Sequence, residues 1–144
     1  MHRHWLLFAT AAMFFAAPRD AAGQSKQAVR PTTRIGVYTT KQAARGAGIY
    51  TLYCKSCHTP ETHSGATFAA HWNGRPLSDL YSFVRDRMPK NDPNSLSEQE
   101  YADVVAYVLK MNKMPVGQSE MPADSTKLSA IRIVTTQATS KREK

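Results

Sequence analysis

The sequence predicts an all-α protein, and three observations support this fold class. Apolar or small residues recur at the spacing of one helical face between residues 39 and 53. A second helix has a well-marked start at Ser97, and Ser78 can cap a third. Nothing in the sequence indicates a sheet of any size. We therefore expect three main helices.

The first predicted helix has both a start signal and an unusual small residue. Thr39 or Thr40 can cap its N-terminus, and Gln42 would complete a capping box from Thr39. A glycine inside a helix costs about 1 kcal/mol relative to alanine. Gly46 therefore suggests that another element approaches this helix closely.

The last predicted helix supplies that element. It begins at a Ser97/Glu100 capping box, with a hydrophobic staple between Leu96 and Tyr101. Asn112 and Pro115 end it. Its apolar stripe consists of Tyr101, Val104, Val105, Val108 and Met111. The residues expected to face inward from the third helix are Leu77, Leu80, Phe83 and Val84.

Residues 1–23 have the pattern of a secretory signal peptide. A basic start precedes an apolar run of 13 residues, Trp5 to Ala17, which is too short to span a bilayer. Small residues at 21–23 predict cleavage before Gln24, and an uncleaved anchor is the alternative. We expect export to the periplasm, with no stable membrane span after cleavage.

The rest of the chain divides into three parts by composition. Residues 24–38 are polar and basic with little periodicity, which indicates a flexible arm. The helical patterns define one domain over residues 39–114. Residues 115–144 form a tail that could wrap the domain, dock a partner or be partly disordered.

The charge balance is basic, with 19 Lys and Arg against 11 Asp and Glu. A positive surface favours encounter with an acidic partner, and it speeds association more than it strengthens binding. Nucleic acid is disfavoured as a partner because the basic residues are scattered and accompany no recognised reader motif.

The pentapeptide CKSCH, from Cys54 to His58, contains both cysteines of the chain. C-x-x-C-H is the attachment sequence of a c-type haem. The two thiols form thioethers with one porphyrin, and the adjacent imidazole of His58 reaches the iron. The alternatives are a redox dithiol, a zinc site and a disulfide. A dithiol would follow a strand, zinc needs more ligands, and so small a disulfide loop stabilises little.

The second axial ligand of such a haem is predicted to be Met88. Its thioether suits low-spin haem iron, and Pro89 stiffens the segment that carries it. His71 is the main rival, whereas His63 is so near His58 that reaching the opposite face would be awkward. Met111, Met114, Met121 and an empty sixth position on the iron also stay open.

These motifs together resemble class I cytochrome c over about residues 40–113. The resemblance rests on Gly46, Tyr50, Cys54, Cys57 and His58, then Met88–Pro89, and then the segment from Asp103 to Tyr107. It implies an all-α fold in which the N- and C-terminal helices cross nearly at right angles over a covalently bound haem. Gly46 and Tyr50 would then meet Val104 and Tyr107.

A closer similarity is to the cytochrome domains of quinoprotein alcohol dehydrogenases and their free-standing relatives. It rests on Phe68, Trp72, Gly74, Arg75, Leu80, the Arg87–Pro89 segment, Ser95–Ser97, Glu100–Asp103, Met121–Asp124 and Ile131–Ile133. It implies that Trp72 packs beside the haem and that Arg75 lies near a propionate. From the residues alone, a tryptophan such as Trp72 is more often core and an arginine such as Arg75 more often a solvated charge.

The expected function is outer-sphere electron transfer by one covalent haem c, and not enzymatic catalysis. The chain has no room for the propeller that does the chemistry in those dehydrogenases. The likeness implies a periplasmic dehydrogenase as electron donor, an oxidase or another cytochrome as acceptor, and a monomer. Two different functions stay open: a tightly bound dehydrogenase subunit, or an open-site haem enzyme or gas sensor if Met88 is not a ligand.

Overall fold

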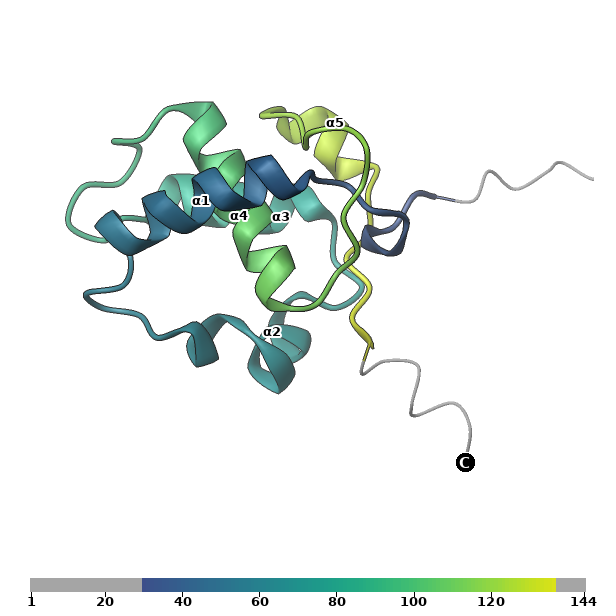
Figure 1. The fold of residues 1–144 in the computed structure, drawn as a ribbon, viewed down its shortest axis with the longest axis horizontal. Helices are drawn as coiled ribbons and strands as arrows, with labels where there is room; N and C mark the ends of the chain where they lie inside the picture. Colours follow the sequence, from purple (N-terminus) through teal and green to yellow (C-terminus); the bar gives the residue numbers. More distant parts are fainter. Residues whose placement is uncertain (1–29, 137–144) are drawn as a thin grey trace, which may run out of the picture.

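A computed structural model describes residues 30–136, and the predicted signal peptide lies outside them (Figure 1). The elements in chain order are η1 (Thr33–Ile35), α1 (Thr40–Tyr53), η2 (Pro60–His63), α2 (Gly65–Trp72), α3 (Leu77–Arg87), α4 (Glu98–Met111) and α5 (Ser125–Ser129). Within the described residues there is no strand, only isolated bridges at Arg132. The predicted all-α fold is confirmed.

The crossing of α1 and α4 is the main packing contact of the fold (Figure 1). Gly46 is buried where they meet, and a Cβ at this position would collide with the backbone carbonyl of Asp103. One turn further along, the rings of Tyr50 and Tyr107 lie 5.4 Å apart. The close approach predicted from Gly46 is therefore confirmed.

The predicted helix starts at Thr39 and Ser97 are confirmed, with one correction at Gln42. Ser97 and Glu100 form the full capping box of α4, and the Thr39 side chain accepts a hydrogen bond from the Gln42 N–H. The Gln42 side chain does not complete a second box. It donates to the carbonyl of Met121 at 2.9 Å and accepts from the Met121 N–H at 2.7 Å. Because Gln42 is fully buried, this pairing satisfies its amide better than a solvent-exposed cap would.

Helix α2 was not among the predicted helices, and α3 differs from its prediction at its start and in one side chain. Ser78 does not cap α3, which begins at Leu77 after Pro76 and has no side-chain cap. Phe68 of α2 is buried in the core, as are Leu77 and Leu80 of α3. Phe83, predicted to face inward with them, is 46% exposed. Phe83 and Val84 instead line a cavity between the helices, which explains the exposure.

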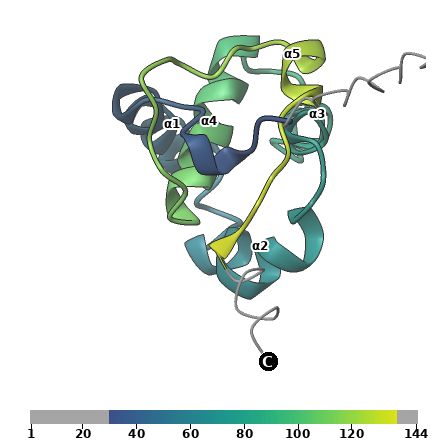
Figure 2. The same ribbon diagram turned by 90° about the vertical axis from the view of Figure 1, so that its right-hand side faces the viewer.

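The packed unit extends beyond the predicted domain at 39–114 on both sides. Thr33 and Tyr38 are buried, so the flexible arm predicted for residues 24–38 does not describe its last part. The Tyr38 hydroxyl donates to the Met114 carbonyl at 2.7 Å. Figure 2 shows the tail running from α5 past α3 toward α2. The tail side chains Met121, Leu128 and Ile133 are fully buried, because they complete the core that α1, α3 and α4 leave open.

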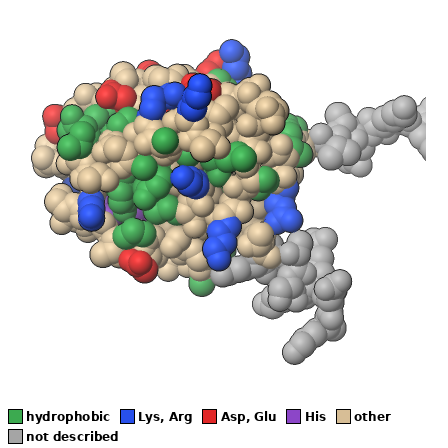
Figure 3. Space-filling view, in the orientation of Figure 1, with side chains coloured by type: hydrophobic (Ala, Val, Ile, Leu, Met, Phe, Trp, Pro, Cys, Tyr) green, Lys and Arg blue, Asp and Glu red, His purple; other side chains and the backbone are tan. Residues whose placement is uncertain are grey.

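The charged side chains on the surface are of two kinds. Some form a cluster of ion pairs, and others lie apart from one another. Arg45 of α1 pairs with the buried carboxylate of Asp103 at 2.7 Å and with Glu120 of the tail at 2.8 Å. On the face in Figure 3, Lys and Arg side chains lie apart, and apolar side chains gather near a histidine. Residues 30–136 include no helix with the length and apolarity of a membrane span.

Candidate functional site

The CKSCH segment continues directly from the end of α1. The Cys54 N–H donates to the Tyr50 carbonyl at 2.9 Å, and the N–H groups of Cys57 and His58 donate back to the Cys54 carbonyl at 3.1 and 3.0 Å. The segment is therefore wound into a compact turn, with Cys54 and His58 partly buried and Cys57 exposed. Both thiols are free.

Burial raises the pKa of the Cys54 thiol. A redox-active dithiol needs a lowered thiol pKa, because the thiolate is the reactive species. Burial at Cys54 therefore shifts its pKa in the direction opposite to the one that activates a thiolate.

A cavity of about 360 Å³ lies between α1, α2, α3 and α4. Five of the six predicted site residues line it: Cys54, His58, Trp72, Arg75 and Met88. Cys57, the sixth, is exposed and does not contribute to the lining. The fold thus brings Cys54 and Met88 to one site, although they are 34 positions apart in the chain.

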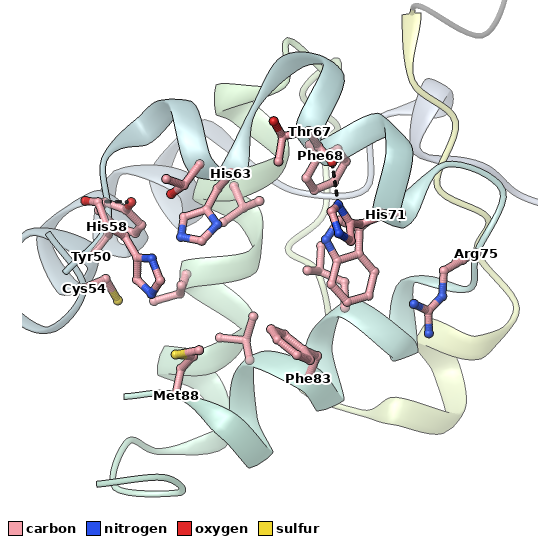
Figure 4. Close-up of a pocket in the computed structure, with 16 residues that line it drawn as sticks. Tyr50, Cys54, His58, His63, Thr67, Phe68, His71, Arg75, Phe83 and Met88 are labelled. Carbon is pink, nitrogen blue, oxygen red and sulfur yellow. Dashed lines mark hydrogen bonds between the residues drawn. The ribbon is translucent and has the colours of Figure 1, made fainter. Parts of the chain in front are cut away.

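His58 and Met88 enter this cavity from different sides. In Figure 4, His58 lies above with Cys54 beside it, and Met88 lies below. His63 packs against His58, with 4.5 Å between the ring centroids, and makes an edge contact with Tyr50. Burial, and then the neighbouring His58, lower the pKa of His63. His63 therefore occupies the same side as His58.

Met88 directly follows α3 and is tied to α4 through its backbone. The Tyr101 hydroxyl donates to the Met88 carbonyl at 3.0 Å and accepts from the Leu96 N–H at 3.3 Å. Pro89 is buried, and its peptide bond with Met88 is cis. The sequence placed Tyr101 in a staple and an apolar stripe, but gave no signal that its hydroxyl holds the Met88 segment.

The wall opposite the CKSCH segment is aromatic and carries one cation. The rings of Trp72 and Phe83 lie 5.5 Å apart, and the Arg75 guanidinium carbon lies 4.8 Å from the centre of the Trp72 ring. Arg75 also pairs with Asp79 at 2.9 Å. Trp72 is thus a wall residue of the cavity, and Arg75 is held at its edge.

His71, the rival second ligand, also lines the cavity. Its Nδ1–H donates to the Thr67 carbonyl at 2.8 Å, which leaves Nε2 as the free nitrogen (Figure 4). Thr67 could not be predicted as a lining residue because the sequence pattern did not predict α2. The structure therefore keeps both Met88 and His71 within the candidate site.

The donor set and the lining both fit a haem. A free thiol, an imidazole and a thioether face one cavity, and these are the groups that attach a c-type haem and ligate its iron. The rest of the lining is mostly apolar, including Phe68, Leu80 and Val104. An apolar cavity of this volume with a few convergent polar groups is typical of cofactor sites.

Comparison with known proteins supports the same class. The family described as cytochrome c oxidase, cbb3-type, subunit III, matches residues 41–108. Neither a curated protein nor a solved structure matches the chain. The matched residues include nearly all of α1, the CKSCH segment, Met88 and most of α4. The match supports a c-type cytochrome, and a cytochrome c domain implies haem binding and electron transfer.

Proposed function

We propose that this chain is a mono-haem electron carrier whose iron is ligated by His58 and Met88. Cys54 and Cys57 would hold the haem as thioethers. The observation that carries the proposal is the cavity in which His58 and Met88 approach from different sides, with Cys54 next to His58. The haem supplies a one-electron Fe(II)/Fe(III) couple, and histidine/methionine ligation raises its potential.

The protein's part in this function is to hold the two ligands still. Hydrogen bonds to the Cys54 carbonyl fix the turn that carries His58, and the Tyr101 hydroxyl fixes the Met88 carbonyl. Electron transfer needs no general acid, base or nucleophile. Ligands that stay in place keep the reorganisation energy of the transfer small. The mostly apolar lining disfavours water in the same space.

Met88 is favoured over the two histidines on different grounds. His63 packs beside His58 and would approach the iron from the same side. His71 keeps its Nε2 available, but it is exposed and lies on the largely exposed α2. A thioether on a segment anchored to α4 fits the sixth position better.

The proposed partners are exported redox proteins with acidic docking surfaces. Lys55 lies between the two cysteines, and Arg87 and Lys90 flank Met88–Pro89. All three are exposed, and none forms an ion pair within residues 30–136. These charges are free to steer a partner toward the haem edge. We propose a periplasmic dehydrogenase as donor, an oxidase or another cytochrome as acceptor, and a monomeric carrier rather than an enzyme.

The absorption spectrum of a Met88→Ala variant tests the ligand assignment. Thioether-ligated ferric haem has a weak far-red band, which Met88→Ala should abolish. Met111→Ala is the matched control, because Met111 is partly buried but does not line the haem cavity. A high-spin wild type, or a far-red band that survives Met88→Ala, would contradict the assignment.

A salt wash separates a diffusing carrier from a tightly bound dehydrogenase subunit. A carrier held through Lys55, Arg87 and Lys90 should leave its partner at high ionic strength, because screening weakens contacts between exposed charges. We expect release from the donor above about 0.5 M salt, at which the Debye length is only a few ångströms. Co-purification through that wash would contradict the carrier and support the subunit.

A further inference from the structure

The tail runs alongside the connection between α2 and α3. The Gly74 N–H donates to the Ile133 carbonyl at 2.7 Å, and the Ile133 N–H donates to the Arg75 carbonyl at 2.9 Å. The Leu77 N–H donates to the Ile131 carbonyl at 2.9 Å. We call residues 131–135 the strap. Its contacts cover the whole connection that carries Arg75.

The far end of the strap is fastened by a side chain. Asn73 Oδ1 accepts from the Thr135 N–H at 2.9 Å and from the Thr135 hydroxyl at 3.2 Å. Asn73 directly follows Trp72 in the chain. The strap therefore ends next to the aromatic wall of the haem cavity.

The other edge of the strap is fastened by the segment before α1. The Thr33 N–H donates to the Arg132 carbonyl, and the Arg132 N–H donates to the Pro31 carbonyl, both at 2.9 Å. The Val134 N–H donates to the Thr33 hydroxyl at 3.0 Å. Ile133 is fully buried. The strap is thus a rigid element and not a loose end.

The connection beneath it has little rigidity of its own. Gly74 has a positive φ of 82°, and a Cβ there would meet no atom, so no packing fixes this residue. The Arg75 N–H donates to the Trp72 carbonyl at 3.1 Å and so closes a turn. The remaining backbone bonds of Gly74 and Arg75 go to Ile133. The strap consequently determines where the Arg75 backbone lies.

We propose that the strap is a positioning element for the haem cavity, which holds the Arg75 guanidinium over Trp72 and thereby raises the reduction potential. A positive charge beside the cofactor favours the state with one more electron, and the Asp79 carboxylate paired with Arg75 offsets part of this effect. Partners outside the ligand set commonly tune a metal centre in this way. The inference rests on the proposed function only in requiring haem in the cavity, and it does not depend on Met88 ligation.

The test is a double-mutant cycle that combines Asn73→Ala with Arg75→Gln. Asn73→Ala removes both bonds to Thr135, so the Gly74 amide should exchange with solvent about tenfold faster. The midpoint potential should fall, in the same direction as for Arg75→Gln but by less. In the Arg75→Gln background, Asn73→Ala should still speed exchange but should no longer change the potential. Ser129→Ala, at an exposed tail position outside the strap, should change neither quantity.

Three results would overturn the proposal. Faster exchange with an unchanged potential would make the strap structural only. An equal fall in potential in the Arg75→Gln background would show that the strap acts through another group. Protein without covalent haem in its wild-type spectrum would overturn both this inference and the proposed function. If Asn73→Ala does not fold, Thr135→Val, which removes only the hydroxyl bond, should give the same signs at smaller size.

Discussion

The two sides of the cavity are built in different ways. The His58 side is one continuous stretch, α1 and the turn that follows it, whose bonds span only a few residues. The Met88 side is assembled from α2 and α3, with Tyr101 of α4 and the tail fastening them. The continuous side therefore depends chiefly on one long-range contact, the crossing with α4, beside the bonds of Gln42 to Met121 and of Arg45 to Glu120. The assembled side depends on several weaker ones.

The largest effect should come from breaking that one contact. Gly46→Ala puts a methyl group into the Asp103 carbonyl, so α1 must move away from α4. We expect a loss of about 3 kcal/mol in the free energy of unfolding, the upper range for overpacking. Urea denaturation and the yield of covalent haem would measure it.

Gly48→Ala is the matched control within the same helix. A Cβ at Gly48 meets no atom, so the better helix propensity of alanine should add up to about 1 kcal/mol. Opposite signs for the two substitutions would show that the crossing, and not helix propensity, supports the continuous side. Equal stability of the two variants would contradict this.

An intermediate effect should follow from releasing Met88. Tyr101→Phe leaves the carbonyl of Met88 and the N–H of Leu96 without their shared hydroxyl partner. We expect a loss of about 1 to 2 kcal/mol, the cost of unsatisfied buried groups, and a far-red band that disappears at lower urea than in wild type. The haem should stay attached.

Tyr50→Phe makes the corresponding change on the continuous side. The Tyr50 hydroxyl reaches the His58 carbonyl only at 3.4 Å, so its removal should cost less than about 0.5 kcal/mol. A larger loss for Tyr50→Phe than for Tyr101→Phe would reverse the comparison between the two sides.

The same difference explains what could be predicted from sequence. The continuous side is encoded locally, so CKSCH, the Thr39 cap and Gly46 sufficed to predict it. Helix α2 was missed because only Phe68 and Trp72 mark its face and no side chain caps it. Met88 was predicted from its chemistry alone.

The tail contacts could not be predicted because each joins residues far apart in the chain. Gln42 has the pattern of a capping residue, and nothing near it indicates that its amide pairs with Met121, 79 positions later. The strap likewise needs Ile133 to be placed beside Arg75. The sequence shows apolar alternation in residues 128–134, but it does not show that this segment pairs with the connection around Arg75.

The smallest effect should appear in the pH dependence of the assembled side. The backbone N–H and the hydroxyl of Ser97 lower the pKa of Glu100 below its ordinary value of 4.5. Glu100 therefore contributes stability that is present above about pH 4.5 and is lost as the pH falls through its lowered folded-state pKa. Protonation weakens the start of α4, next to the bond from Leu96 to Tyr101.

Glu100→Gln keeps the geometry of the capping box but removes this titration. The variant should be slightly less stable than wild type at pH 7 and equally stable once the pH lies well below the lowered pKa of Glu100, so its urea midpoint should fall less over that range. Glu61→Gln gives the comparison on the continuous side, because a hydrogen bond from the Thr59 side chain also lowers the Glu61 pKa. If the assembled side is held more loosely than the continuous side, Glu100→Gln should shift the acid-induced loss of the far-red band to lower pH. Glu61→Gln should not shift it. Equal behaviour of the two variants would mean that acid loosens both sides together.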